Sequence, residues 1–263
     1  MEVRDILGLP PGAIYLLAGT LGGCLGSFAN VLIYRLPRNL SIVRPRSACP
    51  ACGAPLGWHE NIPLLGWLWL RGHCRHCQSP ISAQYPLVEL LGVACGLVAV
   101  WRFGPSWTGL AALLLLINLL VIARIDWEHM IIPHTLTVGG AGLGITLAPL
   151  SGLGLVNALV GGAVGAGLVL VLAYGYKLLR GQIGMGGGDV MLMGMVGTYL
   201  GILGVGMVFF GGALFGTFYA LARYRHHLCG DQKLPFGSFL AAAGVLALLV
   251  GETAVQWYLS LLV

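Results

Sequence analysis

Long apolar runs separated by short polar stretches constrain this chain more than any other feature. Hydrophobic residues make up 57% of the 263 residues and charged residues only 9%, whereas a soluble domain has about 25% charged residues. About 20 apolar residues in a helix cross a bilayer core of about 30 Å, and runs of this kind recur along the sequence. The pattern therefore predicts an all-α polytopic membrane protein and excludes an ordinary soluble domain.

The apolar runs between charged residues define eight candidate transmembrane helices. They cover roughly 13–33, 84–101, 107–124, 135–150, 155–179, 190–203, 205–222 and 237–261. The stretch 190–222 permits either two short spans that turn near Gly201 to Gly206, or one long span that would reverse everything after it. The 42 glycines fit close packing of helices inside lipid.

The basic residues decide the topology. With eight spans and the amino terminus outside, twelve of the fourteen basic residues fall on one face. They are Arg35, Arg38, Arg44, Arg46, Arg71, Arg75, Arg124, Lys177, Arg180, Arg223, Arg225 and Lys233, while Arg4 and Arg102 fall on the other face. The positive-inside rule makes the richer face cytoplasmic. The net charge of +5 therefore requires no nucleic-acid partner, although a basic face also attracts anionic membrane lipid.

The one long hydrophilic stretch, 35–83, lies between the first two spans and carries two CxxC motifs, Cys49-Pro-Ala-Cys52 and Cys74-Arg-His-Cys77. Four thiolates from two tight turns fill a tetrahedral Zn²⁺ site and leave no position for water, so the predicted zinc is structural. The alternative is a pair of disulfides, but the topology places this insert in the reducing cytoplasm, where stable disulfides are rare. Three nearby histidines offer alternative ligands: His59, His73 and His76.

Two of the nine acidic residues stand at predicted cytoplasmic helix ends. Asp126 follows the third span, and Asp189 precedes the sixth, directly after Gly186-Gly187-Gly188. A carboxylate at this depth in a membrane is a functional-site hypothesis by default. Two carboxylates that share one proton can activate a water while the partner donates a hydrogen bond to a carbonyl, which is aspartyl-protease chemistry.

The same acids also fit roles without catalysis. The structural alternative is an ion pair: Asp126 with Arg124, or Asp189 with Lys177 or Arg180. A glycine-rich turn at a helix start can also hold a phosphate, but no GxxxxGK[ST] pattern follows here. Glu89, at the start of the second span, is a candidate either for binding a cationic substrate group or for an orienting ion pair.

Six motifs occur in a fixed order along most of the chain. They are Gly26-Ser-Phe-Ala-Asn-Val-Leu-Ile-Tyr-Arg-Leu-Pro37, the paired CxxC motifs, Tyr85-Pro-Leu-Val-Glu89, Ile125-Asp126, the glycine-rich Asp189 segment and Pro235-Phe-Gly237. Together they resemble the type IV prepilin peptidase family. The resemblance implies an eight-span GxGD-type aspartyl protease that removes a short basic leader from prepilins or type II secretion pseudopilins, at the cytoplasmic face of the bacterial inner membrane.

The resemblance also implies site residues and cofactors. Asp126 and Asp189 match the catalytic aspartates of the family, and Cys49, Cys52, Cys74 and Cys77 match its zinc ligands. Many members also methylate the new amino-terminal residue with S-adenosylmethionine, but no dinucleotide-type glycine fingerprint locates that cofactor here. The implied organisation is a first transmembrane helix over 1–34, the zinc-binding insert over 35–83 and a seven-helix peptidase core over 84–263. The sequence leaves the oligomeric state open.

Two positions depart from the family pattern. The family commonly has GxGDxK, whereas Met191 replaces the lysine after Asp189, and Pro133 is followed by His134 where an acid is frequent. A transporter and a membrane-anchored binding module are the competing classes. Acids at helix ends weigh against the transporter, and the sparse aromatic residues of the insert weigh against nucleic-acid binding.

Overall fold

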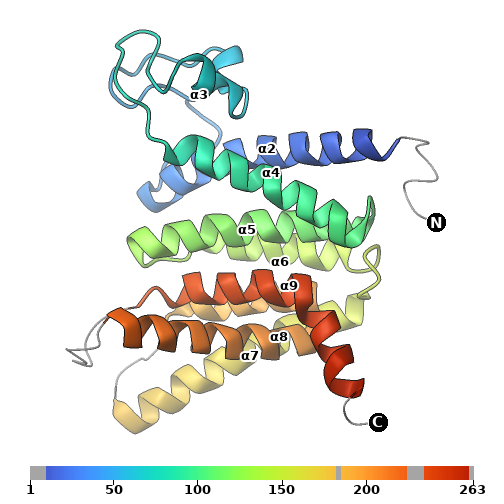
Figure 1. Cartoon of the computed structure of the whole chain (residues 1–263). Coiled ribbons are helices and arrows are strands. Elements are labelled where there is room, and N and C mark those ends of the chain that lie inside the picture. The colour runs from blue at the N-terminus through green and yellow to red at the C-terminus, as the bar shows by residue number, and fades with distance from the viewer. Residues whose placement is uncertain (1–9, 182–184, 224–233, 261–263) are drawn as a thin grey trace. The chain divides into compact units, whose positions relative to one another are not determined.

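The computed structural model describes residues 10–181, 185–223 and 234–260, and helices form all of their long elements (Figure 1). The long helices are α2 (Pro11–Arg35), α4 (Gln84–Phe103), α5 (Trp107–His129), α6 (His134–Leu147), α7 (Leu155–Arg180), α8 (Gly187–Arg223) and α9 (Phe236–Ser260). The insert between α2 and α4 adds the short helices η1 (Leu36–Arg38), η2 (His59–Asn61) and α3 (Leu65–Trp69). Its only strand-like features among these residues are two isolated β-bridges. The predicted all-α membrane class is confirmed.

Six of these helices are long and apolar enough to cross a membrane: α2, α4, α5, α7, α8 and α9. Helix α6 is shorter, with 14 residues. Helix α8 breaks at Gly201, whose φ of 65° and ψ of −169° lie outside the helical region. A Cβ on Gly165 of α7 would meet both Met193, which precedes Gly201, and Val205, which follows it. Because both segments of α8 pack against the same residue of α7, the chain folds back at Gly201. Residues 190–222 therefore form two helical segments, as the two-span alternative predicts.

The third predicted span is longer than expected. Helix α5 continues past 124 to His129, where Arg124 and Glu128 form an i,i+4 ion pair that supports the extra turn. Met130, with a φ of 55°, ends the helix. Asp126 consequently lies on the last turn of α5 and not after it. Of the basic residues that predict the orientation, Arg4, Arg225 and Lys233 lie outside the described residues, and the orientation stays a prediction.

The chain divides into two compact units, Met1–Leu113 and Leu114–Val263. In the first unit, α2 packs against α4 with the two backbones in contact. A Cβ on Gly22 would overlap the carbonyl oxygen of Gly92, and one on Gly26 would lie 2.9 Å from Cα of Glu89. Small residues four apart allow this close approach in a membrane, so the glycines have the packing role that the sequence indicates.

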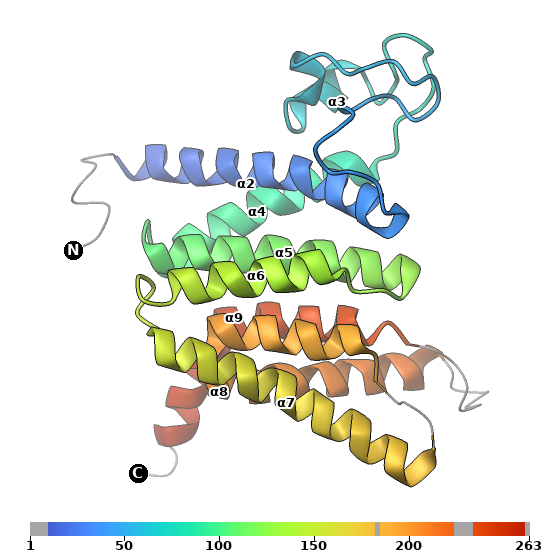
Figure 2. The same cartoon turned by 180° about the vertical axis from the view of Figure 1, so that it is seen from behind.

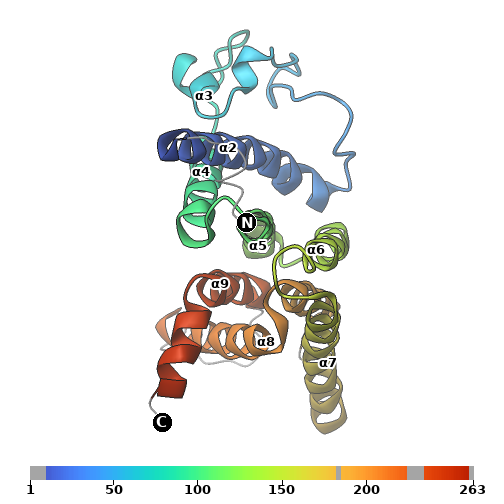
Figure 3. The ribbon, with the colours of Figure 1, turned by 90° about the vertical axis from the view of Figure 1, so that its right-hand side faces the viewer.

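The second unit packs α8 between α7 and α9 (Figure 3). Seen from behind, α7 runs beside the first half of α8 (Figure 2). Gly161 and Gly197 bring these two helices together, because a Cβ on either residue would overlap the backbone of the other. Large apolar side chains fill the interior between the helices, among them the fully buried Ile122, Leu192 and Leu240.

Candidate active site and metal centre

Both candidate aspartates lie in the second unit at helix ends. Asp126, on the last turn of α5, is 5% exposed, and Asp189, on the first turn of α8, is 8% exposed. Burial of a carboxylate costs free energy unless hydrogen bonds compensate for the lost water. The partners of the two carboxylates therefore define the site.

The amino-terminal turn of α9 holds Asp126. The backbone N–H of Ser238 donates a 2.7 Å hydrogen bond to Oδ2 of Asp126, and Oγ of Ser238 lies 3.0 Å from the same oxygen. Ser238 Oγ also lies 3.0 Å from the carbonyl oxygen of Ala123. The N–H groups of a first helical turn have no partner within their helix and carry partial positive charge. Asp126 therefore occupies an anion site formed by α9.

The glycine-rich segment holds Asp189. The N–H of Gly186 donates a 3.1 Å hydrogen bond to Oδ2 of Asp189, and the N–H of Asp189 donates to the carbonyl oxygen of Gly186, also at 3.1 Å. This reciprocal pair fixes the carboxylate to the turn that starts α8. Gly184, two residues before Gly186 in the sequence, lies outside the described residues.

Ile132 connects the surroundings of the two aspartates. A Cβ on Gly188, next to Asp189, would lie 2.9 Å from Cβ of Ile132, and a Cβ on Gly237 would lie 2.6 Å from Cδ1 of Ile132 and 3.0 Å from Oδ2 of Asp126. The fold thus brings the surroundings of two acids that lie far apart in the sequence against one side chain, that of Ile132.

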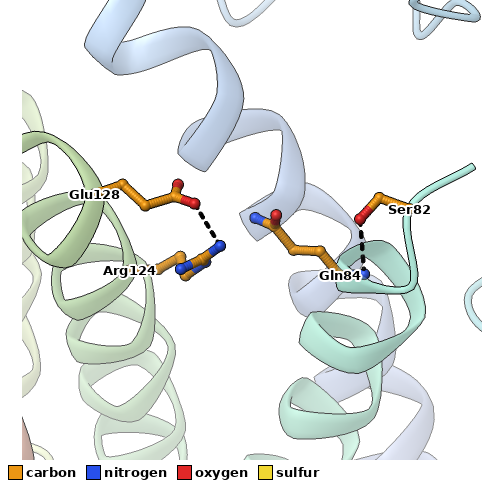
Figure 4. Close-up of polar contacts among 4 residues, drawn as sticks. All are labelled: Ser82, Gln84, Arg124 and Glu128. Carbon is orange, nitrogen blue, oxygen red and sulfur yellow. Dashed lines mark hydrogen bonds and ion pairs between the residues drawn. The ribbon is translucent and has the colours of Figure 1, made fainter.

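An ion-pair role for the aspartates finds no support in the described part of the chain. Arg124 pairs with Glu128 (Figure 4), and Asp126 and Asp189 make no ion pair with any described residue. Met191, which replaces the lysine of the family pattern, is 44% exposed. Sequence reasoning missed Ser238, although the Pro235-Phe-Gly237 motif directly before it was a signal.

The four predicted cysteines of the insert form one cluster. Their Sγ atoms all lie within 4.8 Å of one another, with 3.8 Å between Cys49 and Cys77 and 4.0 Å between Cys52 and Cys74. Tetrahedral zinc with metal–sulfur bonds of about 2.3 Å requires sulfur atoms about 3.8 Å apart, whereas a disulfide requires about 2.05 Å. All four are free thiols. The cluster can hold a metal ion, and the disulfide alternative is wrong.

Two matching turns present these thiols. Gly53 donates its N–H to the carbonyl oxygen of Cys49 at 2.9 Å, and Gln78 donates to that of Cys74 at 3.0 Å. Hydrogen bonds from Ser79 lower the pKa of the Cys77 thiol to about 6, which favours the thiolate that a metal needs. Among the described residues, the cluster that can hold a metal ion contains cysteines alone. His73 instead places Nδ1 2.8 Å from the carbonyl oxygen of Arg71.

The rest of the first unit anchors the insert to the helices. Glu89 on α4 accepts a 2.7 Å hydrogen bond from the N–H of Leu64. Among the described residues, its partner is therefore a backbone N–H of the insert and not a cation. Asn30 on α2 donates a 3.0 Å hydrogen bond to the carbonyl oxygen of Tyr85. At the start of α4, the N–H of Gln84 donates to Oγ of Ser82 at 3.2 Å (Figure 4).

Fold and site define a class: polytopic helical membrane proteins with two buried aspartates at helix ends and a four-cysteine cluster that can hold a metal ion. Residues 20–103 match the family model "Bacterial Peptidase A24 N-terminal domain" and residues 113–221 match "Type IV leader peptidase family". The chain belongs to the type IV leader peptidase family. No solved structure matches it.

Curated relatives carry the name prepilin leader peptidase/N-methyltransferase. The protein of Aeromonas hydrophila is 38% identical over 264 residues, which cover 90% of each chain. That of Myxococcus xanthus is 46% identical over 73% of this chain and 57% of its own length. The protein of Neisseria gonorrhoeae is 34% identical over 98% of this chain and 99% of its own.

Proposed function

We propose that this protein is a membrane aspartyl endopeptidase that removes the leader from prepilins or pseudopilins, with Asp126 and Asp189 as its catalytic pair. The observation that carries the proposal is the arrangement of the two buried carboxylates. Each has one oxygen held by a backbone N–H, and Ile132 contacts the glycine segments beside both. The names of the relatives support the choice of substrate.

The reaction uses a water and one shared proton. One aspartate, as carboxylate, takes a proton from the water while the water oxygen bonds to the scissile carbonyl carbon. The other aspartate, in its protonated form, donates its proton to the carbonyl oxygen. When the tetrahedral gem-diol collapses, the carbon–nitrogen bond breaks, and the leaving nitrogen takes the proton that the first aspartate accepted. One hydroxyl of the gem-diol returns its proton to the second aspartate as it becomes the new carboxyl group. The carboxyl and amine products thus contain the atoms of one water, and the pair returns to its singly protonated state.

The same protein is proposed to methylate the new amino terminus with S-adenosylmethionine as donor. The unprotonated amine attacks the methyl carbon, the bond from carbon to sulfur breaks, and the sulfur keeps the electron pair as a neutral thioether. The excess proton of the methylated amine goes to water. The N-methyltransferase names of the relatives support this second activity.

The four-cysteine cluster is proposed to hold Zn²⁺ in a structural role, because four thiolates complete a tetrahedral shell. The proposed location is the bacterial inner membrane, with the insert and both aspartates on the cytoplasmic face. The excess of basic residues on that face supports the orientation and supports contact with anionic lipid.

Replacement of either aspartate by asparagine tests the peptidase. Asp126→Asn and Asp189→Asn should each lower leader removal by about 10³-fold or more, because neither asparagine can exchange a proton with water. The matched control is Glu128→Gln, which changes an acid two residues from Asp126 on the same helix. The purified full-length protein is incubated with a prepilin, with and without S-adenosylmethionine, and mass spectrometry reads the new amino terminus. Cleavage retained by either asparagine variant would overturn the assignment.

A further inference from the structure

A cavity of about 440 Å³ lies in the first unit, among α2, the insert and the start of α4. Small-molecule sites usually have about 300–1,000 Å³, mostly apolar walls and a few convergent polar groups. The polar groups here include Asn30, Glu60 and Glu89, and Trp67 forms part of the apolar wall. The peptidase chemistry proposed for Asp126 and Asp189 uses none of these residues.

Glu60 is the clearest polar feature of the cavity. Its Oε2 accepts a 2.6 Å hydrogen bond from the N–H of Gly57, which fixes the carboxylate. Its Oε1 is buried and has no hydrogen-bond partner among the residues that the structure describes. Buried polar atoms in native proteins almost always have a partner, and a group without one demands a physical cause. A ligand that donates an O–H or N–H to Oε1 supplies that partner.

Trp67 gives the cavity a fixed aromatic wall. Its Nε1–H donates a 3.2 Å hydrogen bond to the carbonyl oxygen of Ile81, and Gly72 packs so closely that a Cβ there would lie 2.8 Å from the indole ring. Leu64, three residues earlier, has a φ of 63°, and its N–H is held by Glu89. Strained residues of this kind cluster at functional sites.

Opposite charges meet at the cavity. Glu60 and Glu89 line one part of it, while Arg44 and Arg46 line it from the preceding loop. Arg35 holds that loop in place, because its guanidinium donates 2.8 Å hydrogen bonds to the carbonyl oxygens of Ser41 and Pro45. The carboxylates match a cationic centre or hydroxyl donors, and the arginines match a carboxylate. An aromatic face attracts both a cation and a flat heterocycle.

We propose that this cavity is the binding site of the methyl donor, a sulfonium amino acid joined to a purine nucleoside, with Glu60 accepting a hydrogen bond from it and Trp67 contacting its cationic or purine part. This inference rests on the proposed methyl transfer. The donor carries a purine, a ribose diol, a sulfonium cation and both amino-acid charges. One molecule therefore has a group that can interact with the carboxylates, one for the arginines and one for the aromatic ring of the wall.

The metal centre forms part of the same wall. Cys49 and Cys74, the two buried cysteines of the cluster, line the cavity. A metal that holds both CxxC turns therefore also holds the shape of the donor site. Loss of the metal should therefore impair methylation by distorting the donor site, although the metal contacts neither reactant.

Equilibrium binding to the full-length protein in detergent tests the site without any reaction. The probes are sinefungin, in which an ammonium replaces the sulfonium, the neutral S-adenosylhomocysteine, and adenosine monophosphate. Sinefungin should bind tightest, because its ammonium can interact with the carboxylates and its amino-acid carboxylate with the arginines. Adenosine monophosphate should bind weakest, because it has no cation for Glu60 and Glu89. Adenosine monophosphate that binds as tightly as sinefungin would overturn the proposal.

Two variants and one control locate the site. Glu60→Gln keeps an oxygen for Gly57 but turns an amide N–H₂ toward the ligand's donor, and should weaken sinefungin at least tenfold. Trp67→Leu should do the same. Trp69→Leu is the control, since Trp69 lies on the same short helix, is 77% exposed and does not line the cavity. Unchanged metal content and leader cleavage verify that each variant folds, and unchanged sinefungin affinity in both cavity variants would overturn the proposal.

Photo-cross-linking of radiolabelled S-adenosylmethionine to the wild-type protein gives a readout that no substitution can disturb. Label on peptides from 27–89 supports the cavity, and label confined to peptides from 114–263 overturns it. If the wild-type protein cleaves prepilin but neither binds the donor nor methylates the product, the proposed methyl transfer itself is wrong. A protein that methylates while the cavity variants bind sinefungin normally would remove only this inference.

Discussion

The two units build their polar sites in different ways. In the second unit, helix ends and glycine backbone surround Asp126 and Asp189, and each carboxylate is fixed by a main-chain N–H. In the first unit, the polar groups around the cavity come largely from an insert with few helical residues, anchored by side chains such as Glu89. The cavity of the first unit should therefore depend on the metal that holds the loops of the insert together. The aspartate site of the second unit should depend on the absence of side chains at a few glycines.

Loss of the metal should give the largest difference between the units. Cys49→Ser and Cys74→Ser each remove a buried ligand, and structural zinc in small sites contributes about 10–16 kcal/mol of binding free energy. We expect the insert to lose its fold, donor binding and methylation to be lost, and leader cleavage to fall much less. Metal content, sinefungin affinity and cleavage rate measure the three effects. Normal methylation by a variant shown to be metal-free would break the comparison.

Gly237→Ala should impair leader cleavage and leave donor binding intact, which is the opposite of the effect expected from loss of the metal. The added Cβ would lie 3.0 Å from Oδ2 of Asp126 and 2.6 Å from Cδ1 of Ile132, so the carboxylate or the start of α9 must move. A displacement of about 1 Å at a reacting group can cost about 10²-fold in rate. We expect a loss of that order in kcat for leader cleavage, with sinefungin binding unchanged.

Gly206→Ala is the matched control for Gly237→Ala, because a Cβ at this position of α8 meets nothing within 4 Å. It should leave both activities as they are. If Gly237→Ala also cleaves normally, then the site tolerates a Cβ next to Asp126, and the absence of a side chain at residue 237 is not required for catalysis.

The two units could be predicted from the sequence to different depths. Apolar runs and charge placement predict the helices, and the break at Gly201 follows the two-span alternative. The CxxC spacing predicts the cluster because its ligands are close in the chain and need only two tight turns. The aspartates can be singled out as acids at helix ends, but the hydrogen bond from Ser238 depends on how α5 and α9 pack.

The cavity lies beyond sequence reasoning for the same physical reason. Glu60 and Trp67 read as ordinary residues of a hydrophilic insert, and nothing in their spacing indicates that both line one cavity. The strained φ of Leu64 and the unpartnered oxygen of Glu60 are three-dimensional features. The apolar pattern also ends α5 too early, at 124 and not at His129, because the Arg124–Glu128 pair makes the last helical turn look like a polar boundary.

Ser238→Ala should have a moderate effect in the second unit. The substitution removes the hydroxyl near Oδ2 of Asp126 but keeps the N–H that donates at 2.7 Å. A hydrogen bond to a charged group contributes about 1.5–3 kcal/mol, and the remaining N–H should limit the loss, so we expect about a tenfold lower cleavage rate. Ser260→Ala, near the end of the same helix, is the control, because the hydroxyl of Ser260 is exposed and bonds only locally to Trp257. Equal rates for the two variants would exclude a positioning role for the Ser238 hydroxyl.

The smallest effects should come from the two CxxC turns, which differ at one equivalent position. Gly53 follows the first motif with a φ of 72°, and Gln78 follows the second with a φ of 57°. A side chain in this left-handed region costs about 1–2 kcal/mol, whereas glycine adopts it freely but has more conformational entropy to lose on folding. Gly53→Ala should therefore destabilise the metal-bound insert by about 1 kcal/mol, and Gln78→Gly should stabilise it by less than that.

The rate at which a chelator removes the metal from the full-length protein measures both changes. Gly53→Ala should release the metal several-fold faster and Gln78→Gly more slowly, while leader cleavage stays constant in both. Faster release from Gln78→Gly would mean that the Gln78 side chain makes a stabilising contact that outweighs its backbone strain, and the two turns would then not be equivalent. Slower release would show that backbone conformation in these turns sets the lifetime of the metal centre, and through Cys49 and Cys74 the lifetime of the cavity wall beside it.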